Sequence, residues 1–187
     1  MNTGMVYISG GNELLDTDKI FDRIALKSGQ VVADLGCGGA GHFAIPAGRR
    51  VGSQGLVYAV DILKSVLKSV VSRARLEGVS NIKTVWSNLE IAGATRIPKN
   101  SLDMAFLINI LFQSKHDDYV IGEAVRLLKD GGKLLIIDWG RVAPSFGPAA
   151  EDRIKPETLK TIANKLSLKL TDEFEAGKYH FGLLFEK

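Results

Sequence analysis

The fold of this chain is decided by one stretch, Val31-Val32-Ala33-Asp34-Leu35-Gly36-Cys37-Gly38-Gly39-Ala40-Gly41-His42-Phe43. A short apolar run ends in an acid, a cluster of glycines follows at once, and an apolar helical pattern then begins. Glycine adopts backbone angles closed to other residues and leaves no Cβ between the backbone and a ligand. A helix that starts behind such a turn offers free N–H groups and a partial positive charge. The stretch predicts a strand, a tight turn and a helix that hold a polar or anionic part of a nucleotide-like ligand.

Asp34 indicates which ligand suits this turn. Gly36, Gly38 and Gly41 match the G-x-G-x-x-G spacing of dinucleotide-binding proteins, a pattern that is weak by itself. A carboxylate just before the first glycine would face a pyrophosphate unfavourably, because both groups are negative. The same carboxylate would suit an ammonium group. The sequence therefore favours a ligand that brings a cationic amine to the end of the strand.

Asp61 is a second acid in a similar position. It ends the apolar run 56–60 and lies about 20 residues after Gly41, near the spacing at which an acid meets the hydroxyl pair of a ribose. Because a ribose occurs in several cofactors, Asp61 does not choose between them. Two acids that end successive strands, with the glycine turn between them, indicate a binding site rather than two ordinary turn residues.

The glycine stretch and the segment GLVYAVDI at 55–62 resemble class I S-adenosylmethionine-dependent methyltransferases, whose first motif commonly has the sequence D-L-G-C-G-x-G. The likeness continues in IPKNSLDMAFLINIL at 97–111 and EAVRLLKDGGKLLIIDW at 123–139, and it covers roughly residues 28–187. The resemblance implies S-adenosylmethionine as the cofactor and S-adenosylhomocysteine as the product. S-adenosylmethionine carries the ammonium group that Asp34 would suit. The motifs say little about the methyl acceptor.

The resemblance also assigns roles to single residues. Asp34 and the glycine loop hold the methionine part of the cofactor, Asp61 takes the ribose hydroxyls, and Ile62 packs on the adenine. Asn88 and Leu89 stand where the family often has an Asp followed by a small apolar residue. Asn88 departs from that pattern, but its side-chain oxygen can still meet the adenine amino group.

Asn109 ends the fourth strand and is expected either to make a strand-end hydrogen bond or to contact the cofactor or substrate. It is followed by Ile110-Leu111-Phe112 and not by the Asn-Pro-Pro-aromatic motif associated with methylation of exocyclic amines. Methylation of adenine or glutamine nitrogen is therefore not indicated. The full set of predicted cofactor-binding residues is Asp34, Gly36, Cys37, Gly38, Gly41, Asp61, Ile62, Asn88, Leu89 and Asn109.

Apolar segments that alternate with helical patterns predict a parallel sheet with helices on both faces. Strands are expected at 31–34, 56–61, 81–87, 102–109 and 133–139. Helices are expected from residue 16 or 17 to about 25, and at about 41–50, 63–77, 114–128 and 156–166, with residues 91–101 as a loop or a short helix. The last two apolar runs, 168–174 and 179–186, are spaced as a hairpin around residues 175–178.

A hairpin added to a parallel sheet resembles the methyltransferase core, in which the last strand runs antiparallel. The predicted fold class is α/β: a doubly wound, Rossmann-like, seven-stranded and mostly parallel sheet with an antiparallel C-terminal hairpin strand. We expect a single S-adenosylmethionine-binding domain over residues 1–187. Within it, residues 1–27 would form an N-terminal helical or lid segment and residues 28–187 the core.

Composition limits the class of protein. A chain of 187 residues with 45% hydrophobic and 24% charged residues suits one globular domain. The net charge of +3 comes from scattered lysines and arginines, which indicates a solvated surface rather than a nucleic-acid footprint. The longest apolar run, 105–112, is too short for a bilayer, and the N-terminus lacks a signal-peptide pattern. One cysteine excludes an internal disulfide and fits a reducing compartment, so we expect a cytoplasmic protein.

Methyl transfer places few demands on catalytic side chains. The sulfonium is already a good leaving group, so alignment of the acceptor supplies much of the rate, roughly 7–11 kcal/mol, and a general base is optional. His42 is expected to cap a helix or line the glycine loop, and His116 to cap a helix start. His180 lies in the final hairpin, away from the expected site. The catalytic residues therefore stay unassigned.

Four aromatic or basic residues outside the core segments are candidates for the roof of the acceptor pocket, although ordinary packing explains each of them as well: Tyr7, Trp139, Arg141 and Phe146. Cys37 is enclosed by glycines, and its thiol is expected to pack rather than to act as a nucleophile. No ligand cluster accompanies it, so no metal is expected.

The sequence thus predicts a methyltransferase with a small-molecule acceptor. An RNA or protein methyltransferase is the alternative among enzymes, and it would usually show a basic face or an added recognition domain. From other classes, an NAD-dependent oxidoreductase would not need Asp34, and a cofactor-sensing protein without transfer stays open. We expect no membrane partner and no indicated nucleic-acid partner, and homo-oligomerisation is left open.

Overall fold

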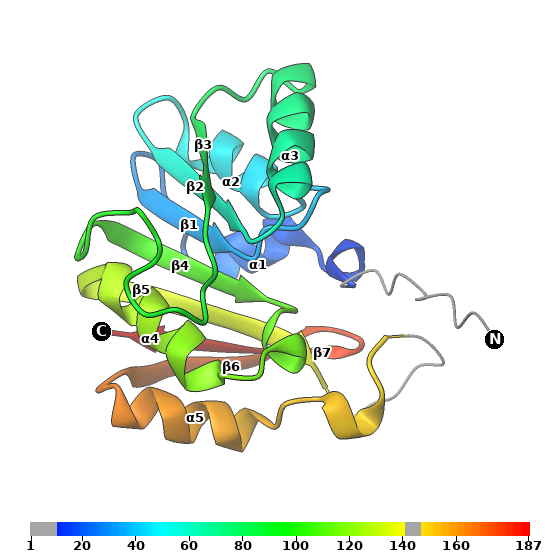
Figure 1. Ribbon diagram of the computed structural model, residues 1–187, viewed down its shortest axis with the longest axis vertical. Coiled ribbons are helices and arrows are strands. Elements are labelled where there is room, and N and C mark those ends of the chain that lie inside the picture. Colours follow the sequence, from blue (N-terminus) through cyan, green and yellow to red (C-terminus); the bar gives the residue numbers. More distant parts are fainter. Residues whose placement is uncertain (1–10, 141–146) are drawn as a thin grey trace.

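The computed structural model describes residues 11–140 and 147–187, which form a twisted sheet with helices on both faces (Figure 1). The strands are β1 Val31–Leu35, β2 Leu56–Asp61, β3 Ile82–Trp86, β4 Leu102–Ile108, β5 Leu128–Trp139, β6 Lys169–Gly177 and β7 His180–Glu186. The α-helices are α1 Thr17–Arg23, α2 Ala44–Val51, α3 Lys64–Leu76, α4 Asp117–Leu127 and α5 Pro156–Lys165. Short 3-10 helices span η1 Asn12–Leu14, η2 Leu111–Gln113 and η3 Ala150–Asp152.

The sheet has seven strands in the order β3-β2-β1-β4-β5-β7-β6. Neighbouring strands pair in parallel from β3 across to β5, while β7 pairs antiparallel with both β5 and β6. β7 is therefore the strand that runs against the other six. This topology confirms the predicted fold class, including the antiparallel strand of the C-terminal hairpin.

Two apolar layers hold the sheet between its helices. Alternate residues of the central strands point to opposite faces, so Val32 belongs to one layer while Ala33 and Leu35 belong to the other. The first layer contains the buried faces of α1, α2 and α3, and the second contains those of α4 and α5. Strands buried on both faces explain why their sequences are apolar almost without alternation.

The structure corrects several predicted boundaries. β5 begins at Leu128, so the expected turn at 130–132 lies within the strand; there the N–H of Gly131 donates to the Lys187 carbonyl oxygen at 2.8 Å. Leu128 itself pairs with Leu102. Residues 91–101 form turns and no helix. The final hairpin turns at residues 178–179, because an irregularity between Glu175 and Gly177 lets β6 continue to Gly177.

Other local predictions are confirmed. Asp16 caps α1 by accepting a hydrogen bond from the N–H of Lys19 at 3.1 Å. Pro46 lies in the first turn of α2, where its missing N–H does little harm. Within the described part of the chain, every helix is too short or too polar to span a bilayer.

Candidate functional site

The glycine loop follows β1 at the edge where the parallel strands end. Gly36, Gly38 and Gly41 all have positive φ angles, of 87°, 63° and 58°. The N–H groups of Gly36 and Cys37 both donate to the carbonyl oxygen of Val60, at 2.8 and 3.0 Å, which fastens the loop to the end of β2. The loop therefore has a fixed shape before any ligand binds.

Two of these glycines serve different purposes. A Cβ on Gly36 would lie 2.6 Å from Cγ2 of Ile110, so this glycine lets the loop pack closely on the residues after β4. A Cβ on Gly38 would meet nothing within 4 Å, so its backbone faces open space. Gly38 therefore offers the bare backbone surface that a ligand can approach.

Asp34 lies beneath this loop and is only 2% exposed. Burial raises the pKa of its carboxyl group to about 7, a hydrogen bond from the Ala44 N–H opposes the rise, and the charge of Asp61 adds to it. Among residues 11–140 and 147–187, Oδ2 of Asp34 has no hydrogen-bond partner. An ammonium group brought by a ligand would supply the missing donor and stabilise the ionised form. The residues present thus fit the methionine end of S-adenosylmethionine.

Asp61 joins the two strand ends of the site. Its Oδ2 accepts a hydrogen bond from the Gly38 N–H at 3.3 Å, and its Oδ1 accepts one from the Leu63 N–H at 2.9 Å. Each carboxylate oxygen can accept a further bond. Asp61 therefore orients the glycine loop and retains capacity for the two ribose hydroxyls.

An exposed apolar surface lies beyond Asp61. Ile62 and Leu63 are 54% and 56% exposed, and Trp86, at the end of β3, is 57% exposed. The indole N–H of Trp86 donates to the carbonyl oxygen of Ile62 at 2.8 Å, and Nζ of Lys64 lies 4.6 Å from the centre of the Trp86 ring. Trp86 thus positions the segment that is predicted to contact adenine. Trp86 is absent from the predicted site residues, although an aromatic residue that ends a strand is a usable signal in the sequence.

Asn88 and Leu89 follow β3 as predicted, and hydrogen bonding and burial determine where their side chains lie. Oδ1 of Asn88 accepts a hydrogen bond from the Glu90 N–H at 2.9 Å, so the side chain folds back on its own loop. Leu89 is 8% exposed and belongs to the apolar layer under α4 and α5. Contacts of these two residues with adenine stay predictions.

Asn109 directly follows β4 and is 2% exposed. Its φ angle of 53° turns its side chain out of the regular strand pattern. Nδ2 donates to Oδ1 of Asn12 at 3.0 Å and lies 3.2 Å from Nε2 of His180. Asn109 is thus bonded away from the glycine loop, with Ile110 between the two, and its contact with the cofactor stays a prediction.

The position expected for His180 is wrong. His180 pairs with Trp139, the last residue of β5, and therefore lies at the edge where the parallel strands end. The reason is the direction of β7, since an antiparallel strand begins where its parallel neighbour finishes. Burial lowers the pKa of the imidazole to about 4, with a smaller effect from the charge of Arg153.

Trp139 packs and does not roof a pocket. The indole is 1% exposed, and Cβ atoms on Gly11 and Gly147 would lie 2.5 and 2.7 Å from it. Its ring centre is 4.5 Å from that of His180. Both glycines are therefore needed for this close packing. The other proposed roof residues, Tyr7, Arg141 and Phe146, lie outside the described residues.

Three smaller predictions have clear outcomes. Cys37 packs in the core at 1% exposure, as expected, and burial raises the pKa of its thiol. Nε2 of His42 lies 3.0 Å from the carbonyl oxygen of Leu15, so it contacts the N-terminal segment. His116 occupies the N-cap of α4, but its side chain makes no capping hydrogen bond, so that prediction is wrong. No group of three potential metal ligands occurs in the part of the chain that the structure describes.

Buried acids fix the loops around the site. Glu123 on α4 is 2% exposed and accepts hydrogen bonds from the N–H groups of Gly93 and Thr95, at 2.9 and 3.0 Å. Burial alone would raise its pKa, but the hydrogen bonds from Arg126 and these N–H groups lower the pKa to about 2. Glu123 therefore ties the loop after β3 to α4. Its role could not be predicted from the sequence, because its partners come from a separate loop.

Asp138 performs a similar task after β4. It is fully buried, and its Oδ2 accepts hydrogen bonds from the N–H groups of Leu111 and Phe112 at 3.2 and 3.3 Å. Burial raises its pKa to about 7, although these hydrogen bonds and one from the Trp139 N–H oppose the rise. Asp138 thus holds η2 against the end of β5.

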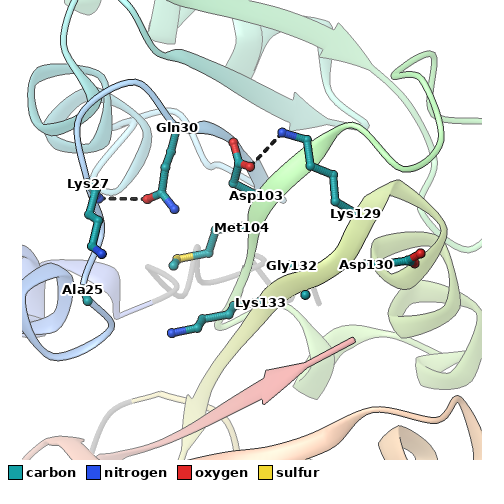
Figure 2. A pocket seen from close by; sticks show the side chains of 10 residues that line it. Ala25, Lys27, Gln30, Asp103, Met104, Lys129, Asp130, Gly132 and Lys133 are labelled. Atoms are coloured by element: carbon teal, nitrogen blue, oxygen red, sulfur yellow. Dashed lines mark hydrogen bonds and ion pairs between the residues drawn. The ribbon is translucent and has the colours of Figure 1, made fainter.

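A cavity of about 260 Å³ opens at the opposite edge, where the strands begin (Figure 2). Lys27, Gln30, Asp103, Lys129 and Lys133 are among the residues that line it. Nζ of Lys129 pairs with Asp103 at 2.7 Å, and Oε1 of Gln30 accepts a hydrogen bond from the Lys27 N–H at 2.8 Å. None of the predicted cofactor residues lines this cavity, so the candidate site is the edge that carries the glycine loop.

The fold and the site together define a nucleotide-cofactor domain of the class I methyltransferase type. A family model described as "Methyltransferase domain" matches residues 26–176. The chain belongs to this family. S-adenosylmethionine is accordingly its cofactor, and S-adenosylhomocysteine the product.

Relatives with printed functions are similar at modest identity. The "Ubiquinone/menaquinone biosynthesis C-methyltransferase UbiE" of Bordetella parapertussis is 33% identical over 147 residues, which is 76% of this chain and 54% of that protein. The protein of the same name from Pseudomonas entomophila is 31% identical over 175 residues, 92% of this chain and 64% of its own length. The chain spans about half the length of the first relatives it matches.

Solved structures agree on the fold. A SAM-dependent methyltransferase from Aquifex aeolicus has a TM-score of 0.84 at 24% identity, with 94% of this chain and 92% of that chain covered. A putative type 11 methyltransferase from Sulfolobus solfataricus has a TM-score of 0.75 at 25% identity, with 93% of each chain covered. Both extend over nearly the whole chain, so the sheet order described above is that of methyltransferase structures.

Proposed function

We propose that this chain transfers the methyl group of S-adenosylmethionine to a ring carbon of an uncharged, hydroxylated small molecule of the quinol class. The observation that carries the assignment of the cofactor is the buried Oδ2 of Asp34, which has no hydrogen-bond donor among residues 11–140 and 147–187. The acceptor half rests on the printed function of relatives that are 31–33% identical over 74–76% of this chain.

The cofactor supplies a methyl group on a sulfonium, and the chain's residues bind and orient. Asp34 receives the ammonium group, and Asp61 receives the ribose hydroxyls at the other side of the glycine loop. In the reaction the acceptor carbon forms the new C–C bond as the S–CH₃ bond breaks, the sulfur keeps the electron pair, and the ring carbon then loses a proton to solvent. Alignment of the acceptor carbon with the methyl group supplies much of the acceleration.

Calorimetry and a labelled-methyl assay test the proposal. We expect the wild-type chain to bind S-adenosylhomocysteine and not NAD, because Asp34 would oppose a pyrophosphate. With labelled S-adenosylmethionine and a naphthohydroquinone we expect label on the ring carbon. Binding of NAD in preference to S-adenosylhomocysteine would overturn the cofactor assignment, and label appearing only with tRNA or protein substrates would overturn the acceptor assignment.

The finer features of this proposal follow from the sequence. We place the chain in the cytoplasm because its single cysteine, Cys37, fits a reducing compartment. We assign no nucleic-acid partner because the lysines and arginines are scattered along the chain. Homo-oligomerisation stays a prediction, and sedimentation of the pure protein measures it directly.

A further inference from the structure

Asn109 and His180 lie together where β4 and β5 end and β7 begins, a place that we name the acceptor end. These three strands lie side by side in the sheet (Figure 1). Ile110, the next residue after Asn109, is the residue that packs against Gly36 of the glycine loop. Asn109 is therefore the sequence neighbour of a residue that contacts the glycine loop. The pair lies on the side of that loop remote from Asp61.

The hydrogen bonds within this pair determine the position of a proton. The amide Nδ2 of Asn109 can only donate, and it lies 3.0 Å from Oδ1 of Asn12 and 3.2 Å from Nε2 of His180. Nε2 must then accept, and the neutral imidazole carries its hydrogen on Nδ1. This hydrogen position follows from the amide orientations of Asn12 and Asn109 in the structure. Since burial and Arg153 lower its pKa to about 4, the ring is neutral near neutral pH.

Two polar atoms are left over in this arrangement. Oδ1 of Asn109 is a hydrogen-bond acceptor and Nδ1–H of His180 is a donor, and both are buried without a partner among the residues that the structure describes. The two side chains are 2% and 4% exposed. Buried polar groups without partners destabilise a folded chain, so such a pair calls for a specific explanation. A bound ligand would satisfy both atoms.

We propose that Asn109 and His180 bind the methyl acceptor, with a hydroxyl of the acceptor donating to Oδ1 of Asn109 and an acceptor oxygen receiving the hydrogen of Nδ1 of His180. The inference rests on the proposed function, because it assigns the residues that recognise the same acceptor. Neither side chain carries a formal charge, which fits an uncharged ligand with both a hydroxyl hydrogen and an oxygen lone pair. A hydroquinone ring has both.

Asn12 orients the amide of Asn109. Asn12 is partly exposed, whereas its hydrogen-bond partner Asn109 is buried. Its segment is held by Gly11 against Trp139 and by His42 on the carbonyl oxygen of Leu15. The Asn12–Asn109 hydrogen bond uses Nδ2 of Asn109, so it orients the amide and leaves Oδ1 available to the hydroxyl of an acceptor.

Two variants of His180 separate recognition from packing. His180→Asn keeps an N–H donor close to the Nδ1 position, whereas His180→Gln keeps a polar group only near the Nε2 position. Asn109→Leu removes Oδ1 at similar volume. His116→Gln, at an exposed histidine on the N-cap of α4, is the matched control.

The measurement is calorimetric titration of naphthohydroquinone, under reducing conditions, into each protein saturated with S-adenosylhomocysteine. We expect His180→Gln and Asn109→Leu to weaken binding of this hydroquinone, the diol, at least about tenfold, because each variant loses a hydrogen bond to a buried partner. The affinities of His180→Asn and His116→Gln for the diol should stay within about threefold of wild type. Affinity for S-adenosylhomocysteine should change by less than about twofold in all four.

The outcomes distinguish the two proposals. Equal diol binding by wild type, His180→Gln and Asn109→Leu would overturn the assignment of this pair, and a change in thermal stability alone would show that ordered water satisfies the two atoms. A wild-type protein that binds S-adenosylhomocysteine but no diol would also overturn it. Failure of the wild type to bind S-adenosylhomocysteine would instead overturn the proposed function.

Discussion

Asp34, Gly38 and Gly41 come from one short stretch of chain, whereas Asn12, Asn109 and His180 come from its early, middle and last parts. We propose that the first group, together with Asp61 one crossover later, forms the cofactor end of the site. We propose the second group as the acceptor end; its residues come together because β7 runs antiparallel and begins beside the end of β5. A site built from one loop can be predicted from consecutive residues of the sequence. A site built from neighbouring strands can be predicted only when the order and direction of the strands are known.

Removal of the Asp34 charge is expected to have the largest effect on ligand binding, and it tests the cofactor end of the site. Asp34→Asn should weaken S-adenosylhomocysteine binding roughly 100-fold, because the ammonium group loses a buried ionic partner. Calorimetry measures the change. Asp138→Asn is the control, since Asp138 is equally buried with a pKa also raised to about 7 but bonds only to backbone N–H groups. Equal affinity in wild type and Asp34→Asn would contradict the assignment of the cofactor end.

The anchor of the loop after β3 tests how far the cofactor end depends on distant residues. Glu123→Ala leaves Arg126 and the N–H groups of Gly93 and Thr95 without their acceptor, so it should lower the free energy of unfolding by about 3 kcal/mol. Urea denaturation measures the change. Glu175→Ala, on the exposed side of β6, should change stability by less than about 0.5 kcal/mol. Similar losses of stability in both variants would contradict the role of Glu123 as the anchor of this loop.

Two glycines of one loop provide an internal comparison. Gly36→Ala places a Cβ 2.6 Å from Ile110 at a positive φ angle, whereas Gly38→Ala has the same backbone strain but meets open space. Gly36→Ala should therefore be less stable than Gly38→Ala by about 1–3 kcal/mol. Thermal unfolding ranks the two. The reverse order would mean that Gly36 does not pack closely on Ile110.

The pH dependence of binding gives the smallest expected effect. The pKa of Asp34 is raised to about 7, and only its ionised form pairs with an ammonium group. Affinity for S-adenosylhomocysteine should therefore rise about tenfold between about pH 6 and pH 8 and then level off. Asp34→Asn should show no such rise. A wild-type affinity that falls with pH over this range would contradict the raised pKa.

The shifted pKa values of Asp34, Asp138 and His180 also change the stability of the folded chain, and the two acids act in the opposite direction to the histidine as the pH changes. Asp34 and Asp138 bind protons more readily in the folded chain, so their contribution to stability is largest in acid and is lost as pH rises through about 7. His180 binds its proton less readily in the folded chain, so its contribution is complete above its unfolded pKa of about 6.5 and is lost as pH falls toward about 4. Ligand binding at the cofactor end relieves the first effect because it stabilises the ionised Asp34.

Much of the fold was predictable from the sequence because it depends on local pattern. Uninterrupted apolar runs indicate strands buried on both faces, and the glycines mark the turn after β1. The start of β5 was not predictable, since Leu128 joins the strand through pairing with Leu102 and not through any local preference. The N-cap of α4 was also misjudged, because the side chain of His116 makes no capping bond.

The site divides in the same way. Asp34 and Asp61 are visible as acids at strand ends. Glu123 is not, because its partners come from another loop. Trp86 was missed although an aromatic residue at a strand end can be recognised in the sequence. The predicted antiparallel direction of the last strand already implied that this strand begins at the edge where its parallel neighbour ends, but that consequence was not applied to His180. The pairing of His180 with Trp139 shows its position.

Because β7 runs antiparallel, residues at its start and residues of the glycine loop lie at the same edge of the sheet but in distant segments of the chain, so the two can be varied separately. If His180 binds the acceptor as proposed, a substitution near the turn at residues 178–179 changes acceptor recognition and leaves the loop after β1 unchanged. Libraries that vary this turn and the first residues of β7 are therefore the place to select new acceptor preferences in a chain that keeps its original cofactor.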